Sequence, residues 1–525
     1  MKKRMSWRLS ALAALVLLVL ATVGATAGRS AFAGTGHASA STLVDGTTDT
    51  VTNIDPAGNY DYGTATLDYQ IFQGLYFNAP GNKLTPTLAT GCEASANLKT
   101  WTCALRRGVK FSDGSTFDSA DVKFSFDRVV KIKDPSGIYT LLSNLKSVST
   151  ASSSRVVFHL KTPQSTWPLI LTTSAALIVP SGSSYPANKI LPSASPQIGT
   201  GPYKLVKFTA GQQAVLQANP NYWGPKPKTS SLIINYYAKS STMKLALQKG
   251  EIDMSFLSFT PTELASLAKT KGITVWKGPG SGIRYLGMTV KRAPTNNIAV
   301  RRALAYLMPR QTIATKVYHG LVTPLYSLVP AGDPGHIDAF ATLYGRKPNP
   351  KKAKAVLAAA GVSTPVAVDV WYTPSHYGDS SADEYAEIKR AFEASGLFKV
   401  TLKTAEWAQY VDTWGKSYNV FQGGWYPDYP DAENYVDPFY APTTFIVTGY
   451  NSPAMNRLMA KEHAARTTAV RLATIRAAQL LAAKDVPIIP YMQLAMIAVS
   501  RNNVHGIPKT LDAAYLMRFS VISKS

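Results

Sequence analysis

Apolar positions along the chain follow two spacings, one typical of strands and one typical of helices. Short apolar runs of strand length begin at Leu43 and recur to the C-terminal end, with amphipathic segments between them. After Asp118, for example, Val122, Phe126 and Val129 follow at intervals of four and three residues, the spacing of one buried helix face. This alternation predicts an α/β fold.

Several predicted helices carry signals at their ends. Thr260 and Glu263 have the spacing of a capping box, with Pro261 at the first helical position. An Asn-Pro pair opens the Ala-rich helix of 349–361 and a glycine closes it. A further helix over 382–395 also stops before a glycine. We expect all three to form.

The first 33 residues have the layout of an export signal. A basic start precedes the apolar run 9–24, and the small residues Ala31 and Ala33 suit cleavage before residue 34. The run is shorter than the roughly 20 residues of a spanning helix, so a cleaved signal is favoured over an uncleaved N-terminal anchor. No Cys follows the run to carry a lipid, and 34–42 is a small, polar linker.

Two cysteines, Cys92 and Cys103, lie in the part that would be exported. In an oxidising compartment an even pair predicts a disulfide, and closing so short a loop contributes about 2–3 kcal/mol. Two buried free thiols are the alternative. Metal binding by this pair is disfavoured because neither CxxC nor CxxH spacing occurs.

The chain is strongly basic, with 55 Lys and Arg against 31 Asp and Glu, a formal charge of +24. Loss of the leader removes five basic residues and leaves +19. The basic residues are dispersed and no nucleic-acid-binding module is recognisable, so we expect no nucleic-acid partner. Attraction to an anionic cell wall is a simpler use of the charge. The seven histidines are scattered, so we expect neither a metal site nor a cofactor.

One segment departs from this basic background. Residues 423–437, GGWYPDYPDAENYVD, hold four acidic and four aromatic residues and neither Lys nor Arg. Such a segment either performs chemistry or binds a cationic group.

The segment 101–128, WTCALRRGVKFSDGSTFDSADVKFSFDR, predicts paired strands at 101–105 and 109–111 and then a helix capped by Asp118. Its string L-R-x-G-V-K-F-S-D-G-x-x-F-x-x-x-D-V-x-F-S closely resembles the mark of family 5 extracellular solute-binding proteins, the peptide- and nickel-binding receptors of ABC importers. Further matches follow in the family's order and cover nearly the whole mature chain: IGTGPYKLVKF (198–208), NPNYWG (219–224), ALQKGEIDM (246–254), VRRALAYL (300–307), AEWAQY (405–410) and the acidic segment.

The resemblance implies an α/β clamshell of the type II periplasmic-binding-protein class, with two lobes, a subdomain inserted in lobe I, and no enzymatic activity. The implied partition is a 1–33 signal peptide, a 34–42 linker, lobe I from 43–70, 186–283 and 488–525, the insertion from 71–185, and lobe II from 284–487. Hinges are expected near 284–290 and 487–493, where a few residues absorb the closing rotation. The implied partners are a peptide or other small solute and the permease and ATPase subunits of an ABC importer, with the protein itself a monomer.

Peptide-binding members of the family present an aspartate of a W-x-x-D segment to the α-ammonium group of the ligand. Asp428 matches that position, and the resemblance therefore implies that it binds the ammonium group. Trp425, Tyr426 and Tyr429 can lend aromatic faces to the cation, and Gly424 lets the backbone approach the ligand. A turn residue in D-Y-P-D is the alternative for Asp428.

Four further residues are candidates for the pocket: Trp407, Trp371, His376 and Tyr60. Dipeptide-binding relatives place an arginine for the ligand's carboxylate near position 376, where this chain has histidine. This departure leaves longer peptides, or ligands without a carboxylate, open. A second departure is Pro309, which we expect to interrupt a helix at a position where relatives carry an acidic or amide residue.

Other functions remain open at this point. A hydrolase using Asp428 and Asp431 is the enzymatic alternative, but no GxSxG or HExxH motif supports it. Within the binding class, nine Trp residues are compatible with an oligosaccharide ligand, and a nickel chelate is a weaker option. A peptide sensor that does not serve transport has the same sequence features.

Overall fold

The computed structural model describes residues 42–525 except 80, 82, 136, 375, 379, 442–445 and 515. The predicted signal peptide, its cleavage site and the linker as far as residue 41 lie outside the described residues. Within the described ranges, none of the helices has both the length and the apolar character needed to cross a membrane.

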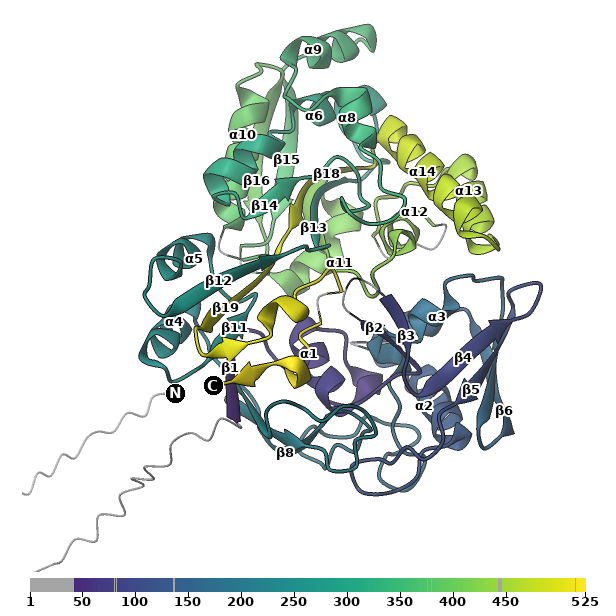
Figure 1. The fold of residues 1–525 in the computed structure, drawn as a ribbon. Helices are drawn as coiled ribbons and strands as arrows, with labels where there is room; N and C mark the ends of the chain where they lie inside the picture. The colour runs from purple at the N-terminus through teal and green to yellow at the C-terminus, as the bar shows by residue number, and fades with distance from the viewer. Residues whose placement is uncertain are drawn as a thin grey trace, which may run out of the picture. The chain divides into compact units, whose positions relative to one another are not determined.

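The first large sheet joins strands from both ends of the chain (Figure 1). Its order is β12-β19-β11-β1-β10-β9-β8, and β1 runs parallel to β10 and β11 while the other pairs are antiparallel. The strands are β1 (Thr42–Thr47), β8 (Tyr203–Thr209), β9 (Gln213–Ala218), β10 (Ser231–Tyr236), β11 (Met254–Phe256), β12 (Ile273–Gly278) and β19 (Met496–Arg501). The same region holds helices α1 (Tyr62–Ile71), α4 (Ser240–Lys249) and α5 (Pro261–Leu267).

The second large sheet has the order β14-β18-β13-β17-β15-β16. Its strands are β13 (Ile283–Met288), β14 (Val322–Pro324), β15 (Val366–Tyr372), β16 (Phe398–Thr404), β17 (Val420–Trp425) and β18 (Ile488–Leu494). The helices of this region are α6 (Ile298–Leu307), α7 (Arg310–Thr312), α8 (Ala339–Tyr344), α9 (Pro350–Ala359), α10 (Ser381–Glu393), α11 (Trp407–Ser417), α12 (Asp437–Tyr440), α13 (Pro453–His463) and α14 (Thr468–Asp485).

A third sheet lies within the segment expected as the insertion and has the order β4-β5-β7-β6. It is built from β4 (Ala89–Ala94), β5 (Thr100–Leu105), β6 (Leu145–Ser152) and β7 (Arg155–Leu160), with helices α2 (Ser119–Ile132) and α3 (Trp167–Ile170). Two small sheets pair β2 (Tyr76–Ala79) with β3 (Lys83–Pro86), and β20 (Val504–His505) with β21 (Ser523–Lys524).

The predicted disulfide is confirmed, since Cys92 and Cys103 are directly opposite each other on β4 and β5 and are bonded. The predicted pairing of 101–105 with 109–111 is wrong. Strand β5 pairs with β4 and β7, and the later segment makes only an isolated bridge from Lys110 to Thr116. Both edges of β5 are already covered, one by β4, which directly precedes it in the chain, and the other by β7, which follows only after α2 and β6.

The predicted helix ends are confirmed. Asp118 caps α2 and forms a capping box with Asp121, and Thr260 forms one with Glu263 at the start of α5. Pro309 does not interrupt a helix, because α6 has already ended at Leu307 and the proline precedes α7.

The chain passes between the two large sheets at two places, from β12 to β13 and from β18 to β19. Residues 488–494 therefore lie in the second sheet, although the expected partition begins the last part of lobe I at residue 488. Both connections are short, between Gly278 and Ile283 and between Leu494 and Met496. Two short segments that link the same two sheets suit a hinge. The lobe boundaries remain a prediction.

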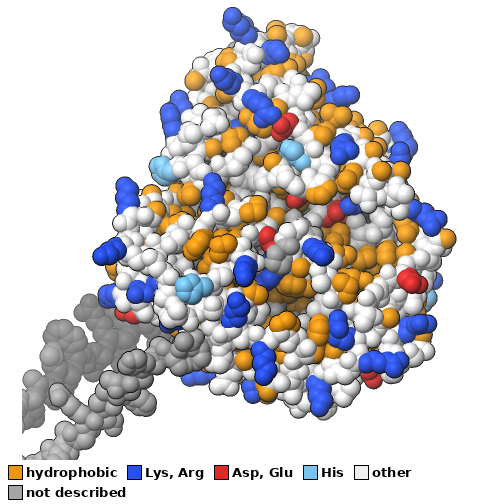
Figure 2. Space-filling model, viewed as in Figure 1, with side chains coloured by type: hydrophobic (Ala, Val, Ile, Leu, Met, Phe, Trp, Pro, Cys, Tyr) orange, Lys and Arg blue, Asp and Glu red, His pale blue; other side chains and the backbone are white. Residues whose placement is uncertain are grey.

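Basic side chains are scattered over the face of the molecule in Figure 2 rather than gathered into one patch. This distribution matches the dispersed Lys and Arg of the sequence.

Candidate functional site

Asp428 lies on the loop between β17 and the short 3₁₀ helix η5 (Ala432–Tyr435), and it faces a residue from the first-sheet region. The Tyr60 hydroxyl donates a hydrogen bond to its Oδ1 over 2.9 Å. The Asn434 amide donates to Oδ2 over 3.1 Å and accepts the Asp428 backbone N–H over 2.9 Å. The carboxylate is thus fixed by two parts of the chain that are 368 residues apart.

The charge of this carboxylate is poorly compensated. Burial raises the pKa of Asp428 to about 6, and the hydrogen bonds from Asn434 and Tyr60 oppose that rise. Both partners are neutral groups, so they orient the carboxylate without cancelling its charge. At neutral pH the group is ionised and suited to a cation.

Trp425 helps to hold Asn434 in place. It is buried, and its Nε1 donates to Asn434 Oδ1 over 3.1 Å. Tyr429 is buried as well, and its hydroxyl donates to Glu433 while its ring lies in the apolar cluster around β4–β7. These two aromatic residues therefore position the loop, whereas Tyr426 is 40% exposed and is available for contact.

Asp431 occupies a different environment from Asp428. Arg471 donates to both of its carboxylate oxygens, each over 2.6 Å. This bidentate pair anchors η5 to α14 and gives Asp431 a structural role.

Arg284, on β13, is a residue that the sequence analysis had placed only in a hinge. Its side chain is 4% exposed, its Nε lacks a hydrogen-bond partner among the described residues, and its guanidinium lies 4.3 Å from the Tyr377 ring centre and 5.6 Å from that of Tyr426. A Cβ added at Gly424 would meet Arg284 Nη1 at 2.5 Å. Gly424 thus makes room for this arginine.

The candidates on β15, on α11 and on the loop after β15 form two separate pairs of stacked rings. His376 lies on Trp407 with ring centres 3.5 Å apart, and Trp371 stacks on Tyr418 at 4.0 Å. Burial and the nearby Arg284 lower the pKa of His376 to about 4. The imidazole is therefore neutral at pH 7 and does not replace the arginine of dipeptide-binding relatives as a charge partner.

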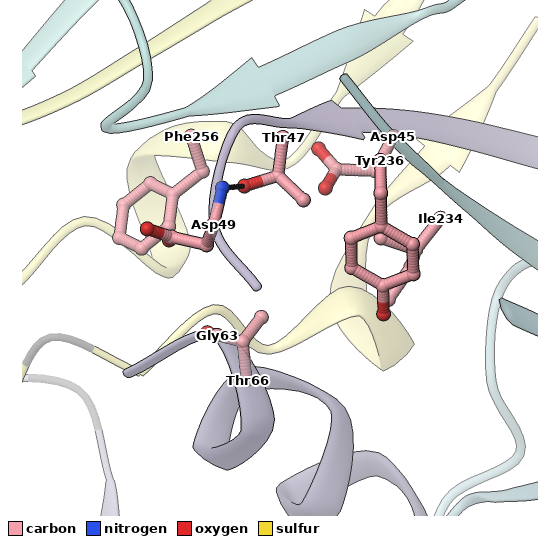
Figure 3. A pocket seen from close by; sticks show the side chains of 8 residues that line it. All are labelled: Asp45, Thr47, Asp49, Gly63, Thr66, Ile234, Tyr236 and Phe256. Atoms are coloured by element: carbon pink, nitrogen blue, oxygen red, sulfur yellow. Dashed lines mark hydrogen bonds between the residues drawn. The ribbon is translucent and has the colours of Figure 1, made fainter. Parts of the chain in front are cut away.

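A small cavity beside β1 is lined by the eight residues of Figure 3: Asp45, Thr47, Asp49, Gly63, Thr66, Ile234, Tyr236 and Phe256. Burial raises the pKa of Asp45 well above its usual range. The Oδ1 atom of Asp45 and the Tyr236 hydroxyl have no hydrogen-bond partner within the part of the chain that the structure describes. The volume of the cavity is about 10 Å³, which is at the lower limit of what one water molecule needs. It has no room for a peptide.

Comparison with known proteins identifies the class. Residues 83–445, more than half of the chain, match the family of bacterial extracellular solute-binding proteins, family 5 Middle. The chain therefore belongs to this family, and the predicted identification is confirmed. It is a solute-binding protein of a non-enzymatic, extracellular or periplasmic family.

Among curated proteins, it is similar to the glutathione-binding protein GsiB of Shigella dysenteriae serotype 1, 26% identical over 466 residues that cover 87% of this chain and 89% of that protein. The dipeptide-binding protein of Escherichia coli K12 is 27% identical over 405 residues, 72% of this chain and 73% of that protein.

Solved structures show the same fold. The periplasmic binding protein DppA of Helicobacter pylori, in complex with the peptide STSA, has a TM-score of 0.78 at 22% identity and covers 92% of this chain and 98% of its own. The substrate-binding protein CtaP of Listeria monocytogenes has a TM-score of 0.80 at 19% identity and covers 92% and 99%. The predicted α/β periplasmic-binding-protein fold is confirmed.

Asn434 and Arg284 are the residues that sequence reasoning missed. Asn434 lies within the acidic segment but carries no charge to attract attention, and Arg284 lies 144 positions before Asp428 in the chain. A signal for Arg284 exists in retrospect, because an arginine in an otherwise apolar strand must find polar or aromatic partners.

Proposed function

We propose that this protein is the substrate-binding component of an ABC importer and that it captures short peptides with a free N-terminus. In this proposal the α-ammonium group of the peptide binds Asp428. The single observation that carries the proposal is a carboxylate oriented by Tyr60 and Asn434 with no charge partner in either.

The position of Asp428 suits closure on a ligand. Tyr60 precedes α1 in the first-sheet region, whereas Asp428 follows β17 of the second sheet. A ligand ammonium at Asp428 that also touches Tyr60 contacts both regions, and such a ligand stabilises the conformation in which they meet. Tyr60 and Tyr426 are each 40% exposed and offer ring faces to the cation.

Arg284 supplies the opposite charge for the other end of a short peptide. Its buried guanidinium lies 5.6 Å from the ring centre of Tyr426, and Tyr426 precedes Asp428 by two residues in the chain. A dipeptide or tripeptide is a zwitterion whose two charged ends need partners of opposite sign. With the neutral His376 beside it, Arg284 takes the part that an arginine near position 376 has in dipeptide-binding relatives.

The names of relatives are compatible with a short-peptide ligand, since GsiB is named for binding glutathione and another relative for binding dipeptides. An oligosaccharide fits less well. Trp371 and Trp407 each have one ring face covered by another aromatic ring, which reduces the flat surface offered to a sugar.

The direct test is titration calorimetry of the ligand-stripped mature protein with di- and tripeptides, in parallel with the same peptides acetylated at the N-terminus. We expect the free peptides to bind and the acetylated ones to lose at least about 100-fold in affinity, because acetylation removes the ammonium charge. Equal affinity for both forms would exclude Asp428 as an ammonium site. Native mass spectrometry of the untreated protein identifies a ligand that copurifies.

Peptide affinity is expected to fall as the pH falls through about 6, the pKa of Asp428. Only the ionised carboxylate pairs with the ammonium group, so the association constant is level above about pH 7 and drops by up to about tenfold per pH unit below 6. Calorimetry between pH 4.5 and about 8 measures this. The slope is absent in Asp428→Asn, which separates this carboxyl from Asp49, whose pKa burial also raises to about 6.

Arg284→Met is expected to weaken binding of a dipeptide by about tenfold or more and to change binding of its C-terminal amide much less. Methionine keeps the apolar stem against Tyr377 but removes the charge. Measurement of both ligands against both proteins gives the coupling between the carboxylate and the guanidinium. A loss of the same size for the amide would assign Arg284 to packing alone.

A further inference from the structure

Three elements bring a histidine and three carboxylates together, and two of these carboxylates, Glu433 and Asp437, belong to the acidic segment. His463 Nε2 lies 3.0 Å from Asp437 Oδ1, 3.7 Å from Glu433 Oε1 and 3.8 Å from Glu462 Oε2. Glu433 belongs to η5, Asp437 begins α12, and Glu462 and His463 end α13. Donor atoms of Glu433, Glu462 and His463 all lie within 4.8 Å of one another.

One carboxylate oxygen of the cluster is buried without a close partner. Glu462 is 1% exposed, and its Oε2 has no hydrogen-bond partner among the described residues. The Oδ1 of Asp437 lies 3.0 Å from His463 Nε2, whereas Glu462 Oε2 lies 3.8 Å from the same nitrogen. Buried polar atoms are almost always satisfied, so Glu462 Oε2 indicates a partner at the centre of the cluster.

The charges of the cluster do not balance. Asp431, Glu433, Asp437 and Glu462 are four negative groups, and Arg471 pairs with both Asp431 and Glu462. When all four carboxyls are ionised and His463 is protonated, two negative charges remain around the buried Glu433 and Glu462. A divalent cation supplies that balance.

We propose that Glu433, Asp437, Glu462 and His463 bind one divalent cation of the Zn²⁺ or Mn²⁺ type. Ligands at about 2.0–2.2 Å from such a metal lie about 3–3.5 Å apart from one another. The distance from His463 Nε2 to Asp437 falls in this range, and those to Glu433 and Glu462, 3.7 and 3.8 Å, exceed it slightly. One imidazole with several carboxylates suits Zn²⁺ and Mn²⁺, whereas Ca²⁺ prefers oxygen ligands alone.

The place of the cluster gives the cation a mechanical role. The His463 carbonyl accepts the backbone N–H of Ser165, from the third-sheet region, over 3.1 Å. Tyr429, which packs into the apolar cluster of that region, donates to Glu433. The cation therefore braces the contact between the third-sheet region and the loop that carries Asp428, and its binding is independent of the ligand's identity.

The test uses untagged, chelator-treated protein and titration calorimetry with MnCl₂ and ZnCl₂, supported by the Mn²⁺ electron paramagnetic resonance signal. We expect one equivalent of metal to bind below about 100 μM, and a higher melting temperature with metal present. The double variant Glu462→Gln/His463→Gln should weaken binding by at least about 100-fold.

A matched control is Glu387→Gln/His505→Gln, which changes the same residue types at other positions and should bind metal like the wild type. Asp428→Asn should also keep its metal affinity, so that a failure of this site and a failure of the peptide site are distinguishable. The proposal is overturned by wild-type protein that binds neither metal below about 1 mM, or by undiminished binding in the Glu462/His463 variant. If that variant does not fold, the wild-type titration and His463→Gln alone decide.

Discussion

Asp428→Asn is expected to weaken binding of a peptide with a free N-terminus by about 30- to 1,000-fold, which corresponds to roughly 2–4 kcal/mol. Asparagine has the shape of aspartate: its Oδ1 can accept from Asn434, and its Nδ2 can donate to the Tyr60 hydroxyl, which then accepts instead of donating. It lacks the negative charge, so the ammonium group of the ligand is left desolvated and unpaired. Titration calorimetry with a dipeptide measures the change.

The matched control for this substitution is Asp412→Asn. Asp412 is an exposed aspartate of α11 that pairs with Lys416, so the same chemical change there should leave affinity unaltered. N-terminally acetylated peptides should bind Asp428→Asn and the wild type about equally. If Asp428→Asn binds free peptides as tightly as the wild type, the ammonium assignment is wrong and a neutral ligand becomes the better explanation.

Asp55→Ala is expected to reduce the free energy of unfolding by about 3–5 kcal/mol. Asp55 is completely buried and its Oδ1 accepts from Arg128 Nη1 over 2.6 Å. It also accepts hydrogen bonds from the backbone N–H groups of Ala57 and Leu191. Removal of the carboxylate leaves a buried guanidinium without its charge partner. Urea denaturation followed by circular dichroism measures the loss.

Asp127→Ala is the control, on helix α2, which also carries Arg128. Asp127 pairs with Lys123 on the surface, where both side chains are about half exposed, and such a pair contributes at most about 1 kcal/mol. The double variant Asp55→Ala/Arg128→Met should recover part of the stability, because it removes the unpaired charge. A loss for Asp55→Ala no larger than that for Asp127→Ala would show that the buried pair does not stabilise the fold.

Local features of the fold could be predicted from the sequence because their causes lie within a few residues. The capping boxes at Asp118 and Thr260 need only a side chain and the N–H three residues later. The disulfide follows from an even number of cysteines in an exported chain. The pairing of β5 with β7 could not be predicted in the same way, since α2 and β6 lie between these two strands in the chain.

The sequence predicted the central aspartate of the candidate site and two of its aromatic neighbours but not the residues that contact them. Asp428, Tyr60 and Tyr426 could be named because one motif and one resemblance point to them. Trp425 and Tyr429 have the right residue type, but packing buries both of them and leaves them to position the loop. Asn434 and Arg284 become part of the site only through their contacts with Asp428, Trp425, Tyr377 and Tyr426.

The sequence by itself determined the α/β class, the family, the disulfide and the aspartate of the binding motif, since each depends on residue type, order and spacing along the chain. The tertiary structure decided which charges are compensated. Arg471 neutralises Asp431, neutral groups hold Asp428, and Glu433, Asp437, Glu462 and His463 come together from three elements. The physical reason is that burial and electrostatic pairing depend on distances in space, and folding brings together groups that the chain keeps far apart.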